Sequence, residues 1–147
     1  MKDQNIGLMG EFRVASELIR RGYNASITFG NAKATDIIVL NKSTYLRIEV
    51  KTCKNGEDFV TNYFPKYTDS DKLHPDIWVL FLPAKDIETG KDRFFILKHV
   101  EIEELQLIVN KGRKTEKGQG VDNIPVRLIE ERKNEIENRW NLLSEII

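Results

Sequence analysis

The chain has 147 residues, the length of one ordinary domain, and 40% of them are hydrophobic while 31% are charged. This composition excludes a disordered or fibrous protein, and no apolar run approaches the roughly 18 residues of a membrane-spanning helix. The single cysteine, Cys53, excludes an internal disulfide framework and a multi-cysteine zinc site. Because the N-terminus has no apolar segment typical of a signal peptide, we expect a cytoplasmic protein with one domain over residues 1–147.

Lys and Arg together number 23, as do Asp and Glu, so the net charge is zero and gives no general affinity for nucleic acid. The charges are nevertheless unevenly placed along the chain. Residues 1–56 contain 9 basic and 5 acidic side chains, whereas residues 57–147 contain 14 and 18, so the two parts carry +4 and −4. The modestly basic N-terminal part permits local binding of phosphate groups.

The first predicted element is a helix over residues 4–21, which ends at Gly22. At 100° per residue its apolar side chains share one face: Leu8, Phe12, Ala15, Leu18 and Ile19. Glu11 lies within this face, whereas Arg13 and Glu17 lie on the opposite, solvated side. A carboxylate in an apolar stripe is costly unless something compensates its charge. Glu11 is therefore a candidate functional residue if other polar groups converge on it, and otherwise a rim residue that reaches water or a lysine.

Two β-rich runs follow, at residues 36–40 and 45–51, and the segment 41–44 between them has the composition of a turn. We therefore predict a hairpin whose turn is centred on Lys42 and Ser43. In that register the numbers of paired residues sum to 85. A slip by one residue would move every side chain to the other face of the sheet.

The predicted register places two carboxylates side by side. Asp36 lies opposite Glu49, and like charges at such positions destabilise a sheet. Lys51, on the same face of the strand, relieves the repulsion in part, and a divalent cation relieves it more fully. Mg²⁺ suits this place because it binds through one or two carboxylates and completes its shell with water and phosphate oxygens. The alternative is a cluster of cross-strand salt bridges on a solvated face of the sheet.

Residues 77–82 and 93–98 predict two further strands, and the first is nearly all apolar, which indicates a central position. A short helix over 101–109 and a short strand over 124–128 follow. A C-terminal helix over about 130–147 is predicted from the spacing of its apolar residues: Ile136, Trp140, Leu143 and Ile147. Together the elements predict an α/β fold, in which an N-terminal helix leads into a mixed, mainly antiparallel sheet with flanking helices.

These features resemble the PD-(D/E)XK nuclease superfamily, and above all its small resolvase-like and intron-homing-type endonucleases. The likeness covers residues 7–54. It rests on Gly10-Glu11 with Ala15, Leu18 and Arg21-Gly22-Tyr23, on Thr35-Asp36-Ile37-Ile38-Val39, and on Ile48-Glu49-Val50-Lys51-Thr52. The resemblance implies a restriction-endonuclease-like core and hydrolysis of DNA phosphodiester bonds.

The resemblance also implies a role for each residue of the predicted site. Asp36 and Glu49 would bind Mg²⁺ or Mn²⁺. Lys51 would orient the attacking water or stabilise charge, and Glu11 would complete the site. The alternative function is a non-catalytic nucleic-acid-binding or protein-interaction module on the same fold.

Several basic residues are candidates for contacts with DNA, either branched or site-specific. Lys33 and Lys54 flank the predicted site, and a basic loop contributes three more: Lys111, Arg113 and Lys114. For each of them, an ordinary solvated position is the alternative. The aromatic residues around Lys66 suit either stacking on bases or, with more weight, packing over a sheet edge: Tyr63, Phe64 and Tyr67. Because cleavage of a duplex requires two active sites, we also expect a homodimer.

Overall fold

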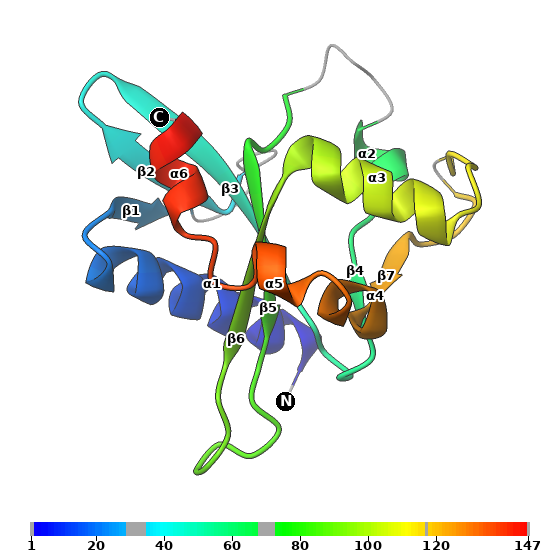
Figure 1. Cartoon of the computed structure of the whole chain (residues 1–147), viewed down its shortest axis with the longest axis horizontal. Coiled ribbons are helices and arrows are strands. Elements are labelled where there is room, and N and C mark those ends of the chain that lie inside the picture. The colour runs from blue at the N-terminus through cyan, green and yellow to red at the C-terminus, as the bar shows by residue number, and fades with distance from the viewer. Residues whose placement is uncertain (1, 29–34, 68–72, 117, 147) are drawn as a thin grey trace.

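The computed structural model describes residues 2–28, 35–67, 73–116 and 118–146, and its centre is a five-stranded sheet in the order β1-β2-β3-β5-β6 (Figure 1). A second, two-stranded sheet pairs β4 with β7. The elements in chain order are α1 (Asp3–Arg20), β1 (Asn24–Ile27), β2 (Ile37–Asn41), β3 (Thr44–Thr52), β4 (Asp58–Val60), α2 (Tyr63–Tyr67), β5 (Ile77–Leu82), β6 (Arg93–Lys98), α3 (His99–Val109), β7 (Asn123–Pro125), α4 (Val126–Glu130), α5 (Lys133–Ile136) and α6 (Asn141–Ile146). In the described part of the chain, no helix has the length and apolar character needed to cross a bilayer.

The central sheet is mixed and mainly antiparallel, as predicted. Only β3 and β5 pair in parallel, while the other neighbours are antiparallel. Parallel strands need a crossover connection, and here the chain between β3 and β5 supplies it and carries β4 and α2. The predicted central strand β5 lies between β3 and β6, and residues 77–81 are all buried.

The predicted register of the β2–β3 hairpin is confirmed. Ile37 pairs with Ile48 and Asn41 pairs with Thr44, so the paired numbers sum to 85 throughout. Lys42, the first turn residue, has a φ of 53°, the left-handed conformation that a two-residue hairpin turn demands. The side chains of β2 and β3 therefore lie on the predicted faces.

The two faces of the sheet build two hydrophobic cores. On one face, α1 and α6 cover strand residues that include Ile48, Val50 and Val79. On the other face, the core comprises Trp78, Leu80 and residues of α2, α3, α4 and α5. Glu49 and Lys51 belong to the second face, because they alternate with Ile48 and Val50 along β3.

The predicted apolar face of α1 is wrong in part, because three of its residues are exposed: Leu8, Phe12 and Ile19. The buried line of the helix is instead Gly10, Val14 and Leu18, at spacings of four residues. Gly10 approaches β3 so closely that a Cβ atom there would lie 1.8 Å from Thr52 Oγ1. A glycine contributes nothing to a hydrophobic pattern, so the periodicity placed the contact face too far round the helix.

This close approach gives a stability prediction with an internal control. Gly10→Leu is expected to lower the free energy of unfolding by about 2–3 kcal/mol, because the side chain has to displace Thr52 and shift α1 from the sheet. Gly7→Ala is expected to raise it by about 0.5–1 kcal/mol, because no atom lies within 4 Å and alanine favours helix. Urea denaturation measures both values. Equal effects at the two positions would contradict the close packing of α1 on β3.

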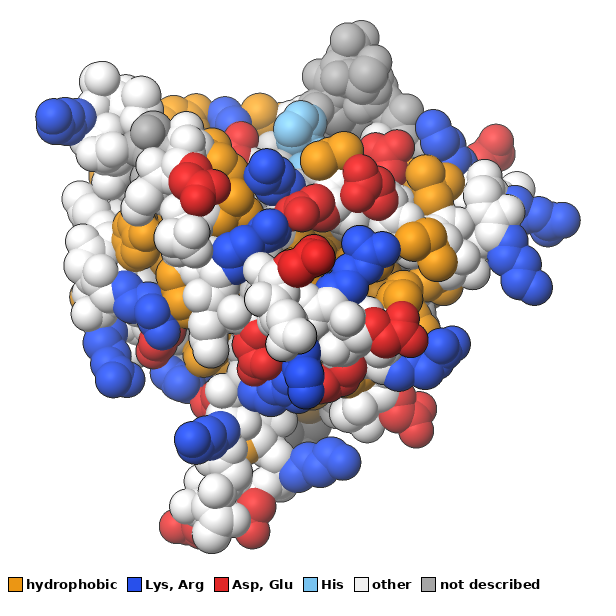
Figure 2. All heavy atoms as spheres, in the orientation of Figure 1, with side chains coloured by type: hydrophobic (Ala, Val, Ile, Leu, Met, Phe, Trp, Pro, Cys, Tyr) orange, Lys and Arg blue, Asp and Glu red, His pale blue; other side chains and the backbone are white. Residues whose placement is uncertain are grey.

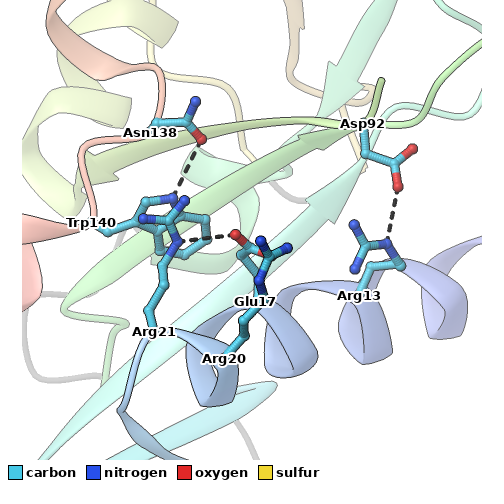
Figure 3. Close-up of polar contacts among 7 residues, drawn as sticks. All are labelled: Arg13, Glu17, Arg20, Arg21, Asp92, Asn138 and Trp140. Carbon is cyan, nitrogen blue, oxygen red and sulfur yellow. Dashed lines mark hydrogen bonds and ion pairs between the residues drawn. The ribbon is translucent and has the colours of Figure 1, made fainter. Parts of the chain in front are cut away.

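The prediction that Arg13 and Glu17 lie on a solvated side of α1 is also wrong. Glu17 is 8% exposed and accepts a hydrogen bond of 3.0 Å from Arg21 Nε. Arg21 in turn lies over the ring of Trp140, at 5.0 Å from its centroid. Arg13 Nε donates to Asp92 Oδ2 at 2.9 Å (Figure 3). These contacts tie α1 to the β5–β6 connection and to the C-terminal segment.

The predicted continuous C-terminal helix is wrong, because the segment forms the short helices α4, α5 and α6. The chain breaks where Glu137 forms a bridge to Phe95 on β6 and Asn138 adopts a φ of 56°. Three of the predicted core residues are still buried: Ile136, Trp140 and Leu143. Ile147 lies outside the described residues. The predicted strand 124–128 is likewise wrong in its second half, since β7 ends at Pro125 and α4 begins at Val126.

Candidate functional site

The candidate site lies where strand β3 extends beyond the end of its neighbour β2. Pairing of β2 with β3 begins at Ile37 and Ile48, but β3 continues to Thr52. In the described chain, residues 49–52 therefore pair with β5 alone. The β2 side of this segment is open to side chains from other elements. Asp36 occupies this edge, and Glu11 of α1 and Lys66 of α2 interact with side chains of the same segment.

Asp36 forms the hydrogen bonds that a longer β2 would form with β3. It lies one residue before β2, and its backbone N–H donates to the carbonyl of Ile48 at 2.9 Å. Its side-chain Oδ2 accepts a hydrogen bond from the backbone N–H of Val50 at 2.8 Å. The carboxyl group thus satisfies a strand donor that β2 does not reach, and this bond fixes Asp36 beside Glu49.

The pKa of Asp36 reflects the carboxylates near it. Burial, followed by the negative charge of Glu49, raises the pKa of Asp36 to about 7. The charge of Glu11 acts in the same direction, while the Val50 N–H and Lys51 oppose the shift. Asp36 is therefore partly protonated near neutral pH, because burial and two neighbouring carboxylates disfavour its ionised form more than Lys51 favours it.

Glu11 reaches the site from the other face of the sheet. It follows Gly10, the residue whose missing side chain lets α1 approach β3. A side-chain interaction with Asp36 lowers the pKa of Glu11, and its carboxylate lies within the fields of Glu49 and Lys51. Burial is the main reason why the pKa of Glu11 is raised. The inward position of Glu11 thus persists, although the face of α1 differs from the predicted one.

Glu49 is the most deeply buried carboxylate of the site, at 4% exposure. Its Oε1 atom forms ion pairs with two ammonium groups: Lys51 Nζ at 3.1 Å and Lys66 Nζ at 3.5 Å. Lys51 comes from the same strand, two residues further on, and Lys66 comes from α2. Both cations are needed to compensate a charge that is nearly excluded from water.

Lys66 and Tyr67 are site residues that the sequence did not identify. The Tyr67 hydroxyl is buried and, within the described chain, has no hydrogen-bond partner. Burial, with the charges of Glu49 and Asp36, raises the pKa of Tyr67. The neighbouring Tyr63 and Phe64 are 2% exposed each, so packing and not base stacking accounts for them. The sequence showed the aromatic residues around Lys66, but it did not show that Lys66 forms an ion pair with Glu49.

The other predicted DNA contacts are exposed to solvent where the structure describes them. Lys33 lies outside the described residues. Lys54 is exposed in the loop after β3, and three basic residues are exposed after α3: Lys111, Arg113 and Lys114. Among the described residues, the ion pairs of Glu49 involve only Lys51 and Lys66. On the face shown in Figure 2, basic and acidic side chains are interspersed and form no single basic surface.

The side-chain oxygens of the site are carboxylate oxygens, the ligands that Mg²⁺ prefers. In the described ranges, no group of three or more His, Cys, Asp or Glu side chains is arranged as a metal site. Asp36 accepts the Val50 N–H beside β3, and Glu49 lies on β3 itself. Two carboxylates suffice for Mg²⁺, which keeps water or phosphate oxygens as its other ligands.

No protein-family model matches the chain, and no curated protein does either. Among solved structures, the chain is similar to that of a bacterial homing endonuclease, I-Ssp6803I. The sequence identity is 13% and the TM-score is 0.48, and the match covers 68% of this chain and 67% of that chain. The similarity concerns the arrangement of helices and strands.

Proposed function

We propose that the protein is a divalent-metal-dependent endonuclease that hydrolyses DNA phosphodiester bonds. The observation that carries the proposal is the convergence of Glu11, Asp36, Glu49 and Lys51 at the open side of β3. These residues come from α1, the start of β2 and the end of β3, in the order that the PD-(D/E)XK resemblance implies. A cross-strand salt-bridge cluster would not need a third carboxylate from a helix on the opposite face.

The residues fit a bound Mg²⁺ or Mn²⁺. Without a cation, the cluster holds a proton on Asp36 up to about pH 7 and leaves the buried Tyr67 hydroxyl without a partner among the described residues. Asp36 and Glu49 would hold the ion. When bound, it would act as a Lewis acid on the phosphoryl oxygen and lower the pKa of the attacking water.

The remaining residues have roles that follow from their contacts. Glu11, through its hydrogen bond, orients the Asp36 carboxyl group. Lys51, whose ammonium lies 3.1 Å from Glu49 Oε1, stabilises the negative charge that develops on the phosphoryl oxygens. The Val50 N–H holds Asp36 from the other side. Duplex cleavage requires two such sites, so we further propose a homodimer.

The test combines metal binding with DNA cleavage. Mg²⁺ and Mn²⁺ are titrated by calorimetry into the parent protein and the Asp36→Ala variant, and plasmid and branched DNA serve as cleavage substrates. We expect the variant to lose both metal binding and cleavage. Glu88→Ala, which removes an exposed carboxylate from the β5–β6 connection, is the matched control and should behave as the parent. Cleavage by Asp36→Ala at the parent rate would show that the activity belongs to a contaminant.

The second candidate is a non-catalytic module that binds nucleic acid or another protein. The interspersed charges on the face shown in Figure 2 favour it, because that face offers no broad basic surface of the kind that positions a duplex for cleavage. DNA binding that is insensitive to Mg²⁺, together with no cleavage of any substrate, would support this module.

A further inference from the structure

The short helix α2 places a second lysine at the proposed site. Lys66 Nζ lies 3.5 Å from Glu49 Oε1, the same oxygen that Lys51 Nζ approaches to 3.1 Å. The two lysines differ in exposure: the side chain of Lys66 is 48% exposed, whereas that of Lys51 is 20% exposed. Lys66 thus connects the buried carboxylate with the solvent.

The backbone of α2 is held firmly, so any movement is confined to the side chain of Lys66. The N–H of Phe64 donates to Asp122 Oδ2 at 2.8 Å, and Asp122 is 2% exposed. The Tyr63 hydroxyl donates to Glu103 Oε2 at 3.0 Å. These bonds tie α2 to α3 and to the segment before β7. A lysine stem on such a base has several rotamers in which its ammonium reaches the solvent rim.

A divalent cation on Glu49 changes the balance of charge at Oε1. A cation there stands beside two ammonium groups, and like charges repel strongly in a partly buried place. Lys51 is fixed by its strand and shielded from water, so it stays. Lys66 is the group that can leave, because half of its side chain is already in water. The released ammonium would then be available to a backbone phosphate of the substrate.

We propose that Lys66 is an exchangeable counter-ion, which neutralises Glu49 in the metal-free protein and binds a backbone phosphate of DNA once a divalent cation replaces it. The inference rests on the proposed function and extends it. It assigns Lys66 to substrate binding and couples DNA affinity to the metal. Tyr67, the next residue, lies within the fields of Glu49 and Asp36, whose charges help to raise the pKa of its hydroxyl.

The experiment uses Lys66→Met, which keeps most of the stem and removes the charge. Lys85→Met is the matched control, because Lys85 is exposed in the β5–β6 connection, which projects from the body of the molecule in Figure 1. Mg²⁺ affinity is measured by calorimetry. Affinity for a labelled DNA duplex is measured by fluorescence anisotropy, once with EDTA and once with Ca²⁺ in place of Mg²⁺. Thermal denaturation establishes that each variant is folded.

We expect opposite changes in the two affinities. Lys66→Met should bind Mg²⁺ about 3–10-fold more tightly than the parent, because a competing cation is gone. It should bind DNA about 10-fold more weakly with Ca²⁺, with a salt dependence reduced by about one phosphate contact, and as well as the parent with EDTA. Lys85→Met should match the parent in every arm.

Two other results would overturn the inference, and they are distinguishable. If Lys66→Met and Lys85→Met bind Mg²⁺ and DNA alike while the parent binds metal and cleaves DNA, the proposed function stands and Lys66 is a fixed partner of Glu49. If the parent neither binds Mg²⁺ nor cleaves DNA, the proposed function fails. Lys66 is then a permanent ion pair of the fold.

Discussion

Lys51→Met is expected to lower kcat for DNA cleavage by about 10²–10³-fold at saturating Mg²⁺, the range found when one pre-organised charge-stabilising group is removed from an active site. Lys51 lies 3.1 Å from Glu49 Oε1 and so stands beside the proposed metal ligands. Methionine keeps much of the stem's volume, so the packing beside Leu80 on β5 is preserved. Single-turnover kinetics with plasmid DNA measures the loss.

The distribution of the effect between kcat and KM separates Lys51 from Lys66. Lys51→Met should act on kcat, because its charge is needed where the transition state develops, whereas Lys66→Met should act mainly on KM. Lys85→Met controls for the loss of one positive charge. If Lys51→Met cleaves at the parent rate, Lys51 serves only as a salt-bridge partner of Glu49, and the nuclease proposal loses its charge-stabilising group.

The core of the site could be predicted because it depends on local rules. A two-residue turn at Lys42 and Ser43 fixes the hairpin register, and strand alternation then fixes which side chains share a face. Asp36 and Glu49 meet as a direct consequence. The end of α1 at Gly22 is of the same kind, since the N–H of Tyr23 bonds to the carbonyl of Leu18 at 3.0 Å in a Schellman motif.

The remaining contributors depend on contacts between distant parts of the chain. Lys66 meets Glu49 because β3 and β5 pair in parallel, and nothing in either strand's sequence dictates that pairing. The face of α1 depends on the contact of Gly10 with Thr52. The break after α5 depends on the bridge from Glu137 to β6. Helical periodicity describes one element at a time and cannot contain such information.

Asp36 has both a structural and a chemical role, and this affects how it is tested. Its Oδ2 accepts a hydrogen bond from the Val50 N–H, and its protonated carboxyl group interacts with the Glu11 carboxylate. Alanine removes both bonds, whereas asparagine preserves them, because its amide oxygen accepts and its amide nitrogen donates. Asn therefore mimics the protonated carboxyl group at every pH and never carries the charge that Asp36 acquires.

Asp36→Asn is accordingly expected to leave the stability of the metal-free protein unchanged below about pH 4, and to stabilise it by on the order of 2 kcal/mol more near pH 8 than near pH 5. In the parent, the pKa of Asp36 is raised to about 7, above its ordinary value of 3.8. Between these two values the folded protein holds a proton that the unfolded chain has released. Stability from this group is complete below pH 4 and is lost as the pH rises through 7.

Comparison with the variant is essential because His99 titrates in the opposite sense. Trp78 Nε1 donates to His99 Nδ1 at 3.0 Å, and burial, with the charge of His74, lowers the pKa of His99 to about 4. Neutral His99 contributes stability that is lost as the pH falls from about 6.5 toward 4. This loss is the same in the parent and in Asp36→Asn, so the difference between the two proteins isolates Asp36.

Thermal denaturation at about pH 5 and about pH 8, with and without Mg²⁺, gives the measurement, and 2 kcal/mol corresponds to a shift in Tm of roughly 5 °C for a domain of this size. Mg²⁺ requires the ionised carboxylate, so it should raise the Tm of the parent near pH 8 and have little effect on Asp36→Asn. A variant that is equally stabilised at both pH values would mean that the proton on Asp36 is not what relieves the repulsion from Glu49 and Glu11. Lys51 and Lys66 would then compensate the carboxylates without the help of that proton, and the proposed metal site would lose its electrostatic argument.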